Sequence, residues 1–105
     1  MRVLQLEAVP VRNSNKLLVK VVYETGAWSW KRTRIAIGCA VLRGSPDKIE
    51  ARMVKLVLEE FPDRSAGGRL ARKVVKMLVN LYTMGVTVHE GKLLWKASDG
   101  RPSTF

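Results

Sequence analysis

The chain of 105 residues has a hydrophobic content of 47%, and its 19 Lys and Arg against 9 Asp and Glu give a formal net charge of +10. This length suits one ordinary domain with its own core, and the single cysteine, Cys39, excludes an intramolecular disulfide and argues against a zinc site, which needs several closely spaced ligands. No apolar run approaches the roughly 18 to 20 residues of a membrane span, so we expect a soluble protein of the reducing cytoplasm, with a nuclear location left open.

The chain begins with two predicted strands. The first, Val3–Val9, is expected to end at Pro10, because proline cannot donate a hydrogen bond to a sheet. The turn-forming residues Arg12–Asn15 join it to the second strand, Leu17–Glu24, in which apolar side chains recur at alternate positions from Leu17. This pattern predicts an antiparallel hairpin.

After Gly26 a third, long strand is predicted from about Trp28 to Leu42. Two sets of side chains alternate near its end. Ile35, Ile37, Cys39 and Val41 share one face, and Ala36, Gly38 and Ala40 share the other. The small residues leave room for close packing by a helix, a ligand or a second subunit.

Residues 46–61 are predicted to form an amphipathic helix. Ser45 suits the N-cap, and Pro46 suits the first helical position because a backbone N–H there would have no partner in any case. The predicted helix ends at Phe61-Pro62. Its apolar residues at helical spacing are Ile49, Met53, Leu56 and Val57.

A second helix is predicted from Ser65 to Met84, because its apolar residues fill one side and Gly85 can serve as a C-terminal cap. The stretches Val86–His89 and Lys92–Ala97 that follow are predicted to form a hairpin turning at Glu90-Gly91.

The resulting element order is β-β-β-α-α-β(-β). It predicts an α+β fold in which an antiparallel sheet of four to five strands carries both helices on one face. Residues 1–97 are expected to form this single domain, and residues 98–105 a polar tail. From Leu17 to Ala97 the order is similar to the core of bacterial-type KH domains, with a glycine-containing loop between the helices. The GxxG signature of that family is absent, because Gly67 and Gly68 are adjacent, so the resemblance assigns no site residues.

A cationic stripe is the first candidate site. Four bases of the second predicted helix fall on one side of it, opposite the apolar residues. An ordinary solvated helix face mixes both signs, because like charges at i,i+4 cost a few tenths of a kcal/mol. The stripe is therefore either the charged face that any amphipathic helix needs or a surface for phosphates. Its members are Arg69, Arg72, Lys73 and Lys76.

The start of the same helix adds a second candidate. Gly67 and Gly68 lie in its first turn, where each costs up to ~1 kcal/mol relative to alanine, and Arg64 and Arg69 lie near the positive end of the helix dipole. A bound phosphate would reconcile both features, because it accepts hydrogen bonds from first-turn amides and pairs with arginine. A flexible loop between helices explains the same glycines.

The start of the third strand is the third candidate. It combines aromatic and basic side chains, a mixture that suits single-stranded nucleic acid because bases stack on indole rings while arginines contact phosphates. The tryptophans could instead close the core or a subunit interface. The candidate residues are Trp28, Trp30, Lys31, Arg32 and Arg34.

Catalytic chemistry has no support in the sequence. Cys39 is expected to be a small buried apolar residue, and His89, the only histidine, lies at a predicted turn with no evident partner. We therefore expect no enzyme, no metal, no cofactor and no small-molecule substrate.

The leading hypothesis is a non-enzymatic nucleic-acid-binding protein that favours RNA or single-stranded DNA, with a homodimer through the sheet as a further expectation. The alternative is a small basic interaction protein that docks on an acidic protein surface or on an anionic membrane.

Overall fold

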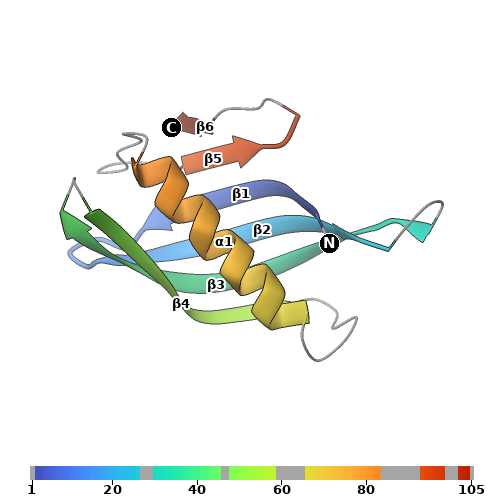
Figure 1. The fold of residues 1–105 in the computed structure, drawn as a ribbon, viewed down its shortest axis with the longest axis horizontal. Helices are drawn as coiled ribbons and strands as arrows, with labels where there is room; N and C mark the ends of the chain where they lie inside the picture. Colours follow the sequence, from blue (N-terminus) through green and yellow to red (C-terminus); the bar gives the residue numbers. More distant parts are fainter. Residues whose placement is uncertain are drawn as a thin grey trace.

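The computed structural model describes residues 2–26, 30–45, 48–58, 66–83, 93–98 and 102–104, which form six strands and one α-helix (Figure 1). The elements in chain order are β1 (Arg2–Pro10), β2 (Lys16–Thr25), β3 (Arg32–Ser45), β4 (Lys48–Leu58), α1 (Ala66–Thr83), β5 (Leu93–Lys96) and β6 (Pro102–Thr104).

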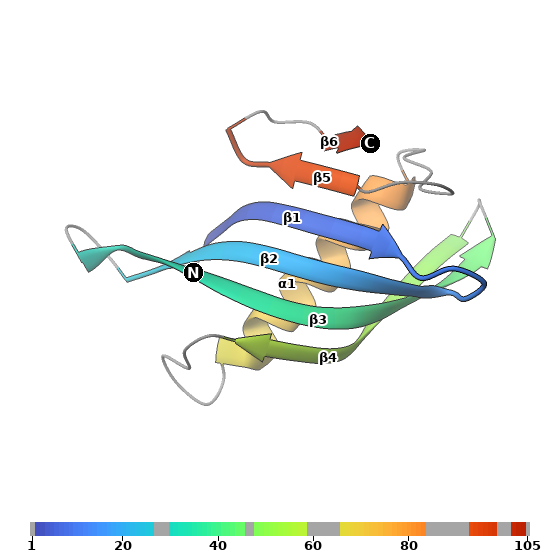
Figure 2. The same ribbon diagram turned by 180° about the vertical axis from the view of Figure 1, so that it is seen from behind.

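All six strands belong to one antiparallel sheet with the order β4-β3-β2-β1-β5-β6. The first four strands follow one another as a meander, and β5 then pairs with the free side of β1. The last strand, β6, lies in the segment predicted to be a tail and pairs with β5. Figure 2 shows the molecule from behind, with the face of the sheet that α1 does not cover toward the viewer.

The core lies between α1 and one face of the sheet. The predicted alternation in β2 is confirmed, since Val19, Val21 and Tyr23 are buried while Leu18 and Lys20 are exposed. Burial of such apolar surface is the main favourable contribution to folding. The side chains that α1 adds to the core are Leu70, Val74, Leu78, Leu81 and Tyr82.

The small residues of β3 face the helix. Ala36 and Ala40 are buried in the core, and Gly38 lies between them on the same side. A side-chain carbon at Gly38 would overlap the carbonyl oxygen of Lys55 on β4. Of the occupants left open by the sequence, α1 is therefore the element that packs over these residues, and Gly38 also permits the close approach of β4.

The predicted helix over residues 46–61 is wrong, because residues 48–58 form strand β4, which pairs with β3. The error has a local cause: β4 contains a β-bulge at Val54, the residue that has no partner between Met53 and Lys55. The bulge lengthens the apolar spacing from two residues to three between Met53 and Leu56. Apolar positions at 49, 53 and 56 then imitate a helical period although the backbone is extended.

The predicted fold class is corrected accordingly. The described residues contain one helix on the sheet, not two, and most of them lie in strands. The similarity to the KH element order therefore does not hold, since that order requires two helices. Predictions for Pro46, Phe61-Pro62, Gly85 and Val86–His89 lie outside the described residues. Within those residues, no helix has the length and apolar composition needed to cross a bilayer.

Candidate nucleic-acid interface

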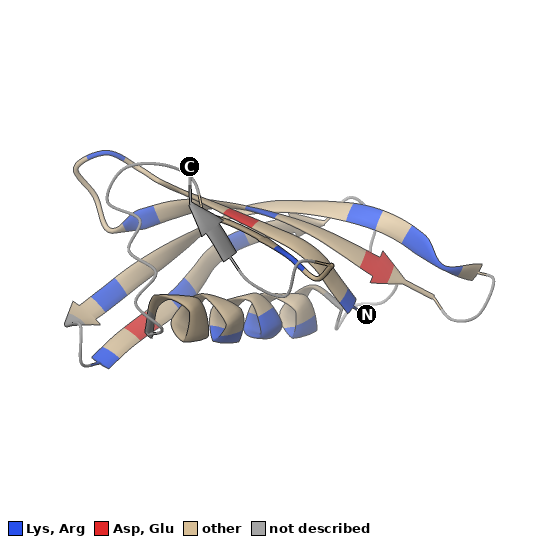
Figure 3. Cartoon of the chain, turned by 90° about the horizontal axis from the view of Figure 1, so that it is seen from above, with Lys and Arg blue, Asp and Glu red and all other residues tan. Residues whose placement is uncertain are grey.

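The side of α1 that points away from the sheet is cationic. Its apolar residues face the core, so the periodicity of the helix leaves its bases on the opposite side, as Figure 3 shows. The helix contains no acidic residue. We call this surface the outer face of α1, and its four exposed bases are Arg69, Arg72, Lys73 and Lys76.

Among the described residues, the acids lie on strands and not on α1. The described residues include three carboxylates, all on strands: Glu7, Glu24 and Glu50. Lys31 pairs with Glu24 and Lys48 with Glu50, each at 3.8 Å, and the side-chain amide of Gln5 donates to Glu7 at 3.1 Å. Within the described part of the chain, neither Arg72 nor Lys76 has an ion-pair partner. At Arg72 and Lys76 the outer face therefore presents positive charge that is available to a bound anion.

The first turn of α1 is open to solvent at one side. Gly67 and Gly68 lie in this turn, as predicted, and Gly68 is exposed. The nearest atom to a side-chain carbon placed on Gly68 would be Nη1 of Arg72, at 3.7 Å. The guanidinium of Arg72 therefore lies back over the glycine, close to the beginning of the helix. Arg64 lies outside the described residues.

The structure does not place all the aromatic and basic candidates near β3 on one surface. Trp30 precedes the strand and is 78% exposed, and Arg32 is exposed as well. Arg32 and Arg34 pair with Thr25 and Tyr23, which places them on the sheet face that carries α1. Trp28 lies outside the described residues.

Lys31 differs from its neighbours because it pairs with Glu24, a residue whose alternation places it on the face opposite α1. Figure 3 shows that the hairpin of β2 and β3 extends beyond the first turn of α1. The structure therefore brings Arg32 and Arg34 to the same side of the sheet as the outer face of α1, and it directs Lys31 elsewhere.

The sequence analysis missed the surface on the other side of the sheet, here called the open face. Four aliphatic side chains lie there across three neighbouring strands, with Lys20 on β2 and Lys55 on β4 beside them. Alternation in residues 17–24 already placed Leu18 and Lys20 on one face, but the helix predicted at 46–61 concealed the contribution of β4. We call the four side chains the aliphatic strip: Leu18, Ile35, Ile37 and Val57.

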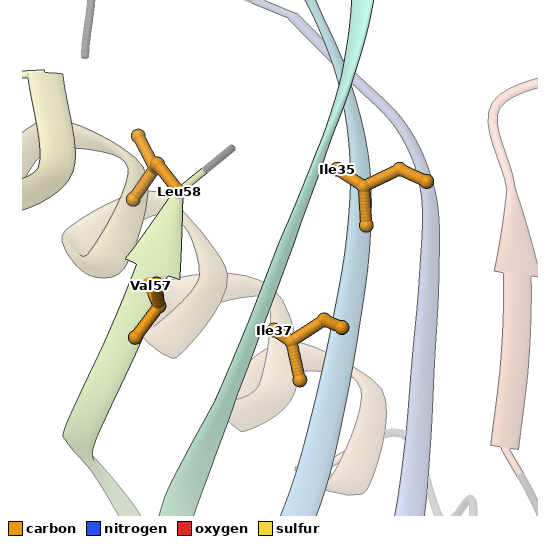
Figure 4. Close-up of a pocket in the computed structure, with 4 residues that line it drawn as sticks. All are labelled: Ile35, Ile37, Val57 and Leu58. Atoms are coloured by element: carbon orange, nitrogen blue, oxygen red, sulfur yellow. The ribbon is translucent and has the colours of Figure 1, made fainter. Parts of the chain in front are cut away.

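Three residues of the strip line a shallow hollow together with Leu58. It has a volume of about 320 Å³, and its walls come from β3 and β4 (Figure 4). Ile35 and Ile37 point to the same side of β3. All four described side chains that line it are aliphatic.

Few other described residues carry groups that could bind a metal ion or take part in a reaction. The described residues contain no cluster of three or more His, Cys, Asp or Glu that could hold a metal ion. Cys39 is half-buried, and its thiol makes only a weak contact, at 3.9 Å, with the carbonyl oxygen of Ala40. Burial raises the pKa of the Tyr82 hydroxyl above its ordinary value of 10.0.

The chain was also compared with known proteins. It matches no family model, no curated protein and no solved structure.

Proposed function

We propose that the protein binds nucleic acid, with a preference for RNA or single-stranded DNA, through the outer face of α1 and the start of β3 on the same side of the sheet. The observation that carries this proposal is the exposure of four bases along a helix that has no acid. Positive charge gathered along one surface attracts a polyanion.

The outer face has a suitable length for several phosphates. Residues 69–76 extend about 10 Å along the helix axis at about 1.5 Å per residue. Phosphates of one stacked strand follow each other at about 3.4 Å, so roughly three of them fit along this stretch. Together with Arg32 and Arg34 the surface offers six bases, for which we expect a slope of log affinity against log salt of roughly −4 on a single strand.

Trp30 supports the preference for single strands. An indole that is 78% exposed loses little by contacting a base and gains a stacking surface, and such stacking contributes ~1 to 3 kcal/mol per base. Bases are accessible for stacking in single strands but not inside a duplex. Arg32, two residues along the chain, is exposed and can contact the phosphate backbone beside a stacked base.

The test is a double charge reversal, Arg72→Glu with Lys76→Glu, measured by fluorescence anisotropy with a labelled single-stranded RNA of mixed sequence. Both residues are exposed and have no ion-pair partner in the described part of the chain. Loss of two phosphate contacts lowers the affinity by at least ~25-fold at about 0.1 M salt, because each contributes ~0.7 to the slope.

The matched control is Arg12→Glu with Lys16→Glu. These two residues are also one arginine and one lysine four positions apart, both exposed, and they lie at the turn between β1 and β2. Each single substitution lowers the net charge by two, so the two double variants lower it by the same amount. Equal weakening by the two variants, with folding verified by circular dichroism, would show attraction by total charge and refute a site on α1.

Binding to other anions is measured in the same series. Vesicles of equal parts phosphatidylcholine and phosphatidylserine replace the RNA in one arm. A chain that binds these vesicles and ignores RNA and DNA at every salt concentration is a membrane-surface protein, and the proposal is then wrong.

A further inference from the structure

The open face of the sheet carries an unusual amount of exposed aliphatic surface. In the aliphatic strip, Leu18 is 54% exposed, Ile37 60% and Val57 52%, and the three come from β2, β3 and β4, which are neighbours in the sheet. Scattered apolar residues are normal on protein surfaces, but a contiguous strip marks a surface that binds something.

The chemistry of the strip favours a protein partner over nucleic acid. Bases stack on aromatic rings, and none of the described strand residues on the open face is aromatic: Tyr23 and Trp95 lie on the side of the core. Aliphatic side chains on a sheet pack well against the aliphatic side chains of a second sheet, as in two-layer β-structures.

The charges of this face include both signs, which allows it to pair with a second copy of the same chain. Among the described strand residues, three carboxylates lie here among eight bases, and each carboxylate is opposite a base of the neighbouring strand: Glu24 opposite Arg2, Glu7 opposite Lys20, and Glu50 opposite Arg43. A surface that contains both signs around an apolar centre can be complementary to itself across a two-fold axis. The outer face of α1 cannot, because it contains only bases.

We propose that two copies of the chain associate through their open faces and form a homodimer with the two sheets face to face. Four strands about 4.8 Å apart, each about seven residues long at about 3.3 Å per residue, present roughly 450 Å² per copy. The two faces together bury roughly 900 Å², which lies below the ~1,200 Å² of stable specific interfaces and in the range of weak, transient ones. We therefore expect a weak dimer that forms at high protein concentration.

The remaining bases of the open face give the dimer a distinctive dependence on salt. Lys16, Arg52, Lys55 and Lys96 have no acid opposite them in the sheet register, and they repel their counterparts in the second copy. Salt screens this repulsion and leaves the apolar contact intact. Dimerisation strengthens as salt rises, whereas binding to a polyanion weakens.

The experiment is analytical ultracentrifugation of the full chain, freed of nucleic acid, from low to several hundred micromolar at low and high salt. The average mass is expected to rise from 11.8 kDa to twice that value, and to rise at lower concentration in high salt. The variant Ile37→Asp places a carboxylate in the strip at an exposed position and is expected to remain at 11.8 kDa throughout.

Val11→Asp is the matched control, because Val11 is an exposed aliphatic residue in the turn after β1 and lies outside the strip. It should dimerise like the unmodified chain. Cys39 gives an independent measure, since it faces the partner in the proposed dimer and is the only thiol: its reaction with a thiol reagent should slow as protein concentration rises.

Three outcomes overturn the proposal. The unmodified chain could remain a monomer at the highest concentration in high salt, Ile37→Asp could dimerise as well as Val11→Asp, or the mass could grow without limit beyond two copies.

Discussion

The outer face of α1 and the open face of the sheet are opposite surfaces of one small, basic protein, and they differ in kind. The first has four bases and no acid, and the second has an aliphatic strip among charges of both signs. A net charge of +10 describes neither of them. The comparison teaches that the total charge predicts an affinity for polyanions in general, whereas the distribution assigns different partners to different surfaces.

The comparison predicts that no single substitution removes both RNA binding and self-association, and this gives the largest expected effects. We expect the reversal Arg72→Glu with Lys76→Glu to reduce affinity for single-stranded RNA by at least ~25-fold at about 0.1 M salt and to leave self-association unchanged. Ile37→Asp is expected to abolish self-association and to change RNA affinity per chain by less than about two-fold, since it lies on the other side of the sheet from α1.

The measurement combines anisotropy titrations with sedimentation of the same preparations. If Ile37→Asp weakens RNA binding as much as the helix reversal does, the two surfaces are not independent, and a dimer is then needed for binding.

The contact between β3 and β4 determines whether the aliphatic strip exists, because it places Val57 beside Ile37. Gly38→Ala is expected to lower the free energy of unfolding by about 1 to 3 kcal/mol, since the added carbon overlaps the Lys55 carbonyl. Urea denaturation measures this change. Gly68→Ala is the control: it adds the same carbon to an open position of α1 and should raise the stability by up to ~1 kcal/mol. Equal effects at the two glycines would contradict the close approach.

Trp30 sharpens the assignment of the first surface to single strands. Trp30→Ala is expected to weaken binding of single-stranded RNA by about ten-fold, within the ~1 to 3 kcal/mol of one stacked base. Binding of a duplex of equal length should change much less, because its bases are not available for stacking. Competition titrations with the two ligands test this prediction. An equal loss for both ligands would indicate that Trp30 only supports the local fold.

The smallest effect concerns Tyr82, which lies on the inner side of α1 with its hydroxyl buried and without a hydrogen-bond partner among the described residues. The pKa of Tyr82 is raised by burial. Below pH 10 the tyrosine is protonated in both states and adds no pH dependence. Above this value the unfolded chain loses the proton first, so stability falls as pH rises.

The variant Tyr82→Phe removes this dependence. Near neutral pH it is expected to be neutral or slightly stabilising, because it removes a buried hydroxyl, and its advantage over the unmodified chain should grow above pH 10. Urea unfolding at several pH values measures the difference. RNA affinity should not change, since the ring faces the core; a parallel stability profile for both proteins would show that Tyr82 is solvated.

Much of the fold was predictable because local signals were strong. The alternation in β2 and the capped, amphipathic pattern of α1 predicted Leu17–Glu24 and Ser65–Met84, against the observed Lys16–Thr25 and Ala66–Thr83. The outer face of α1 followed directly from that helix. In each of these elements the same spacing of apolar residues continues from one end to the other.

The rest was not predictable because it depends on pairing between distant residues. The bulge at Val54 exists only in relation to Cys39 and Ala40 of β3, and no window of the sequence contains that relation. A helix over residues 46–61 leaves no place for Val57 and Lys55 beside Ile37 and Cys39. The aliphatic strip was lost for the same reason, since it is made by three strands together.

The same bulge affects how the edge of the sheet can pair with further strands. β4 is an edge strand, and a long regular edge invites further strands to add to it, which leads to fibres. The extra residue at Val54 bends this edge and interrupts its hydrogen-bonding pattern. Three bases of the same strand, Lys48, Arg52 and Lys55, add positive charge along it. The protein can thus expose aliphatic side chains on its open face while the β4 edge resists the open-ended addition of further strands.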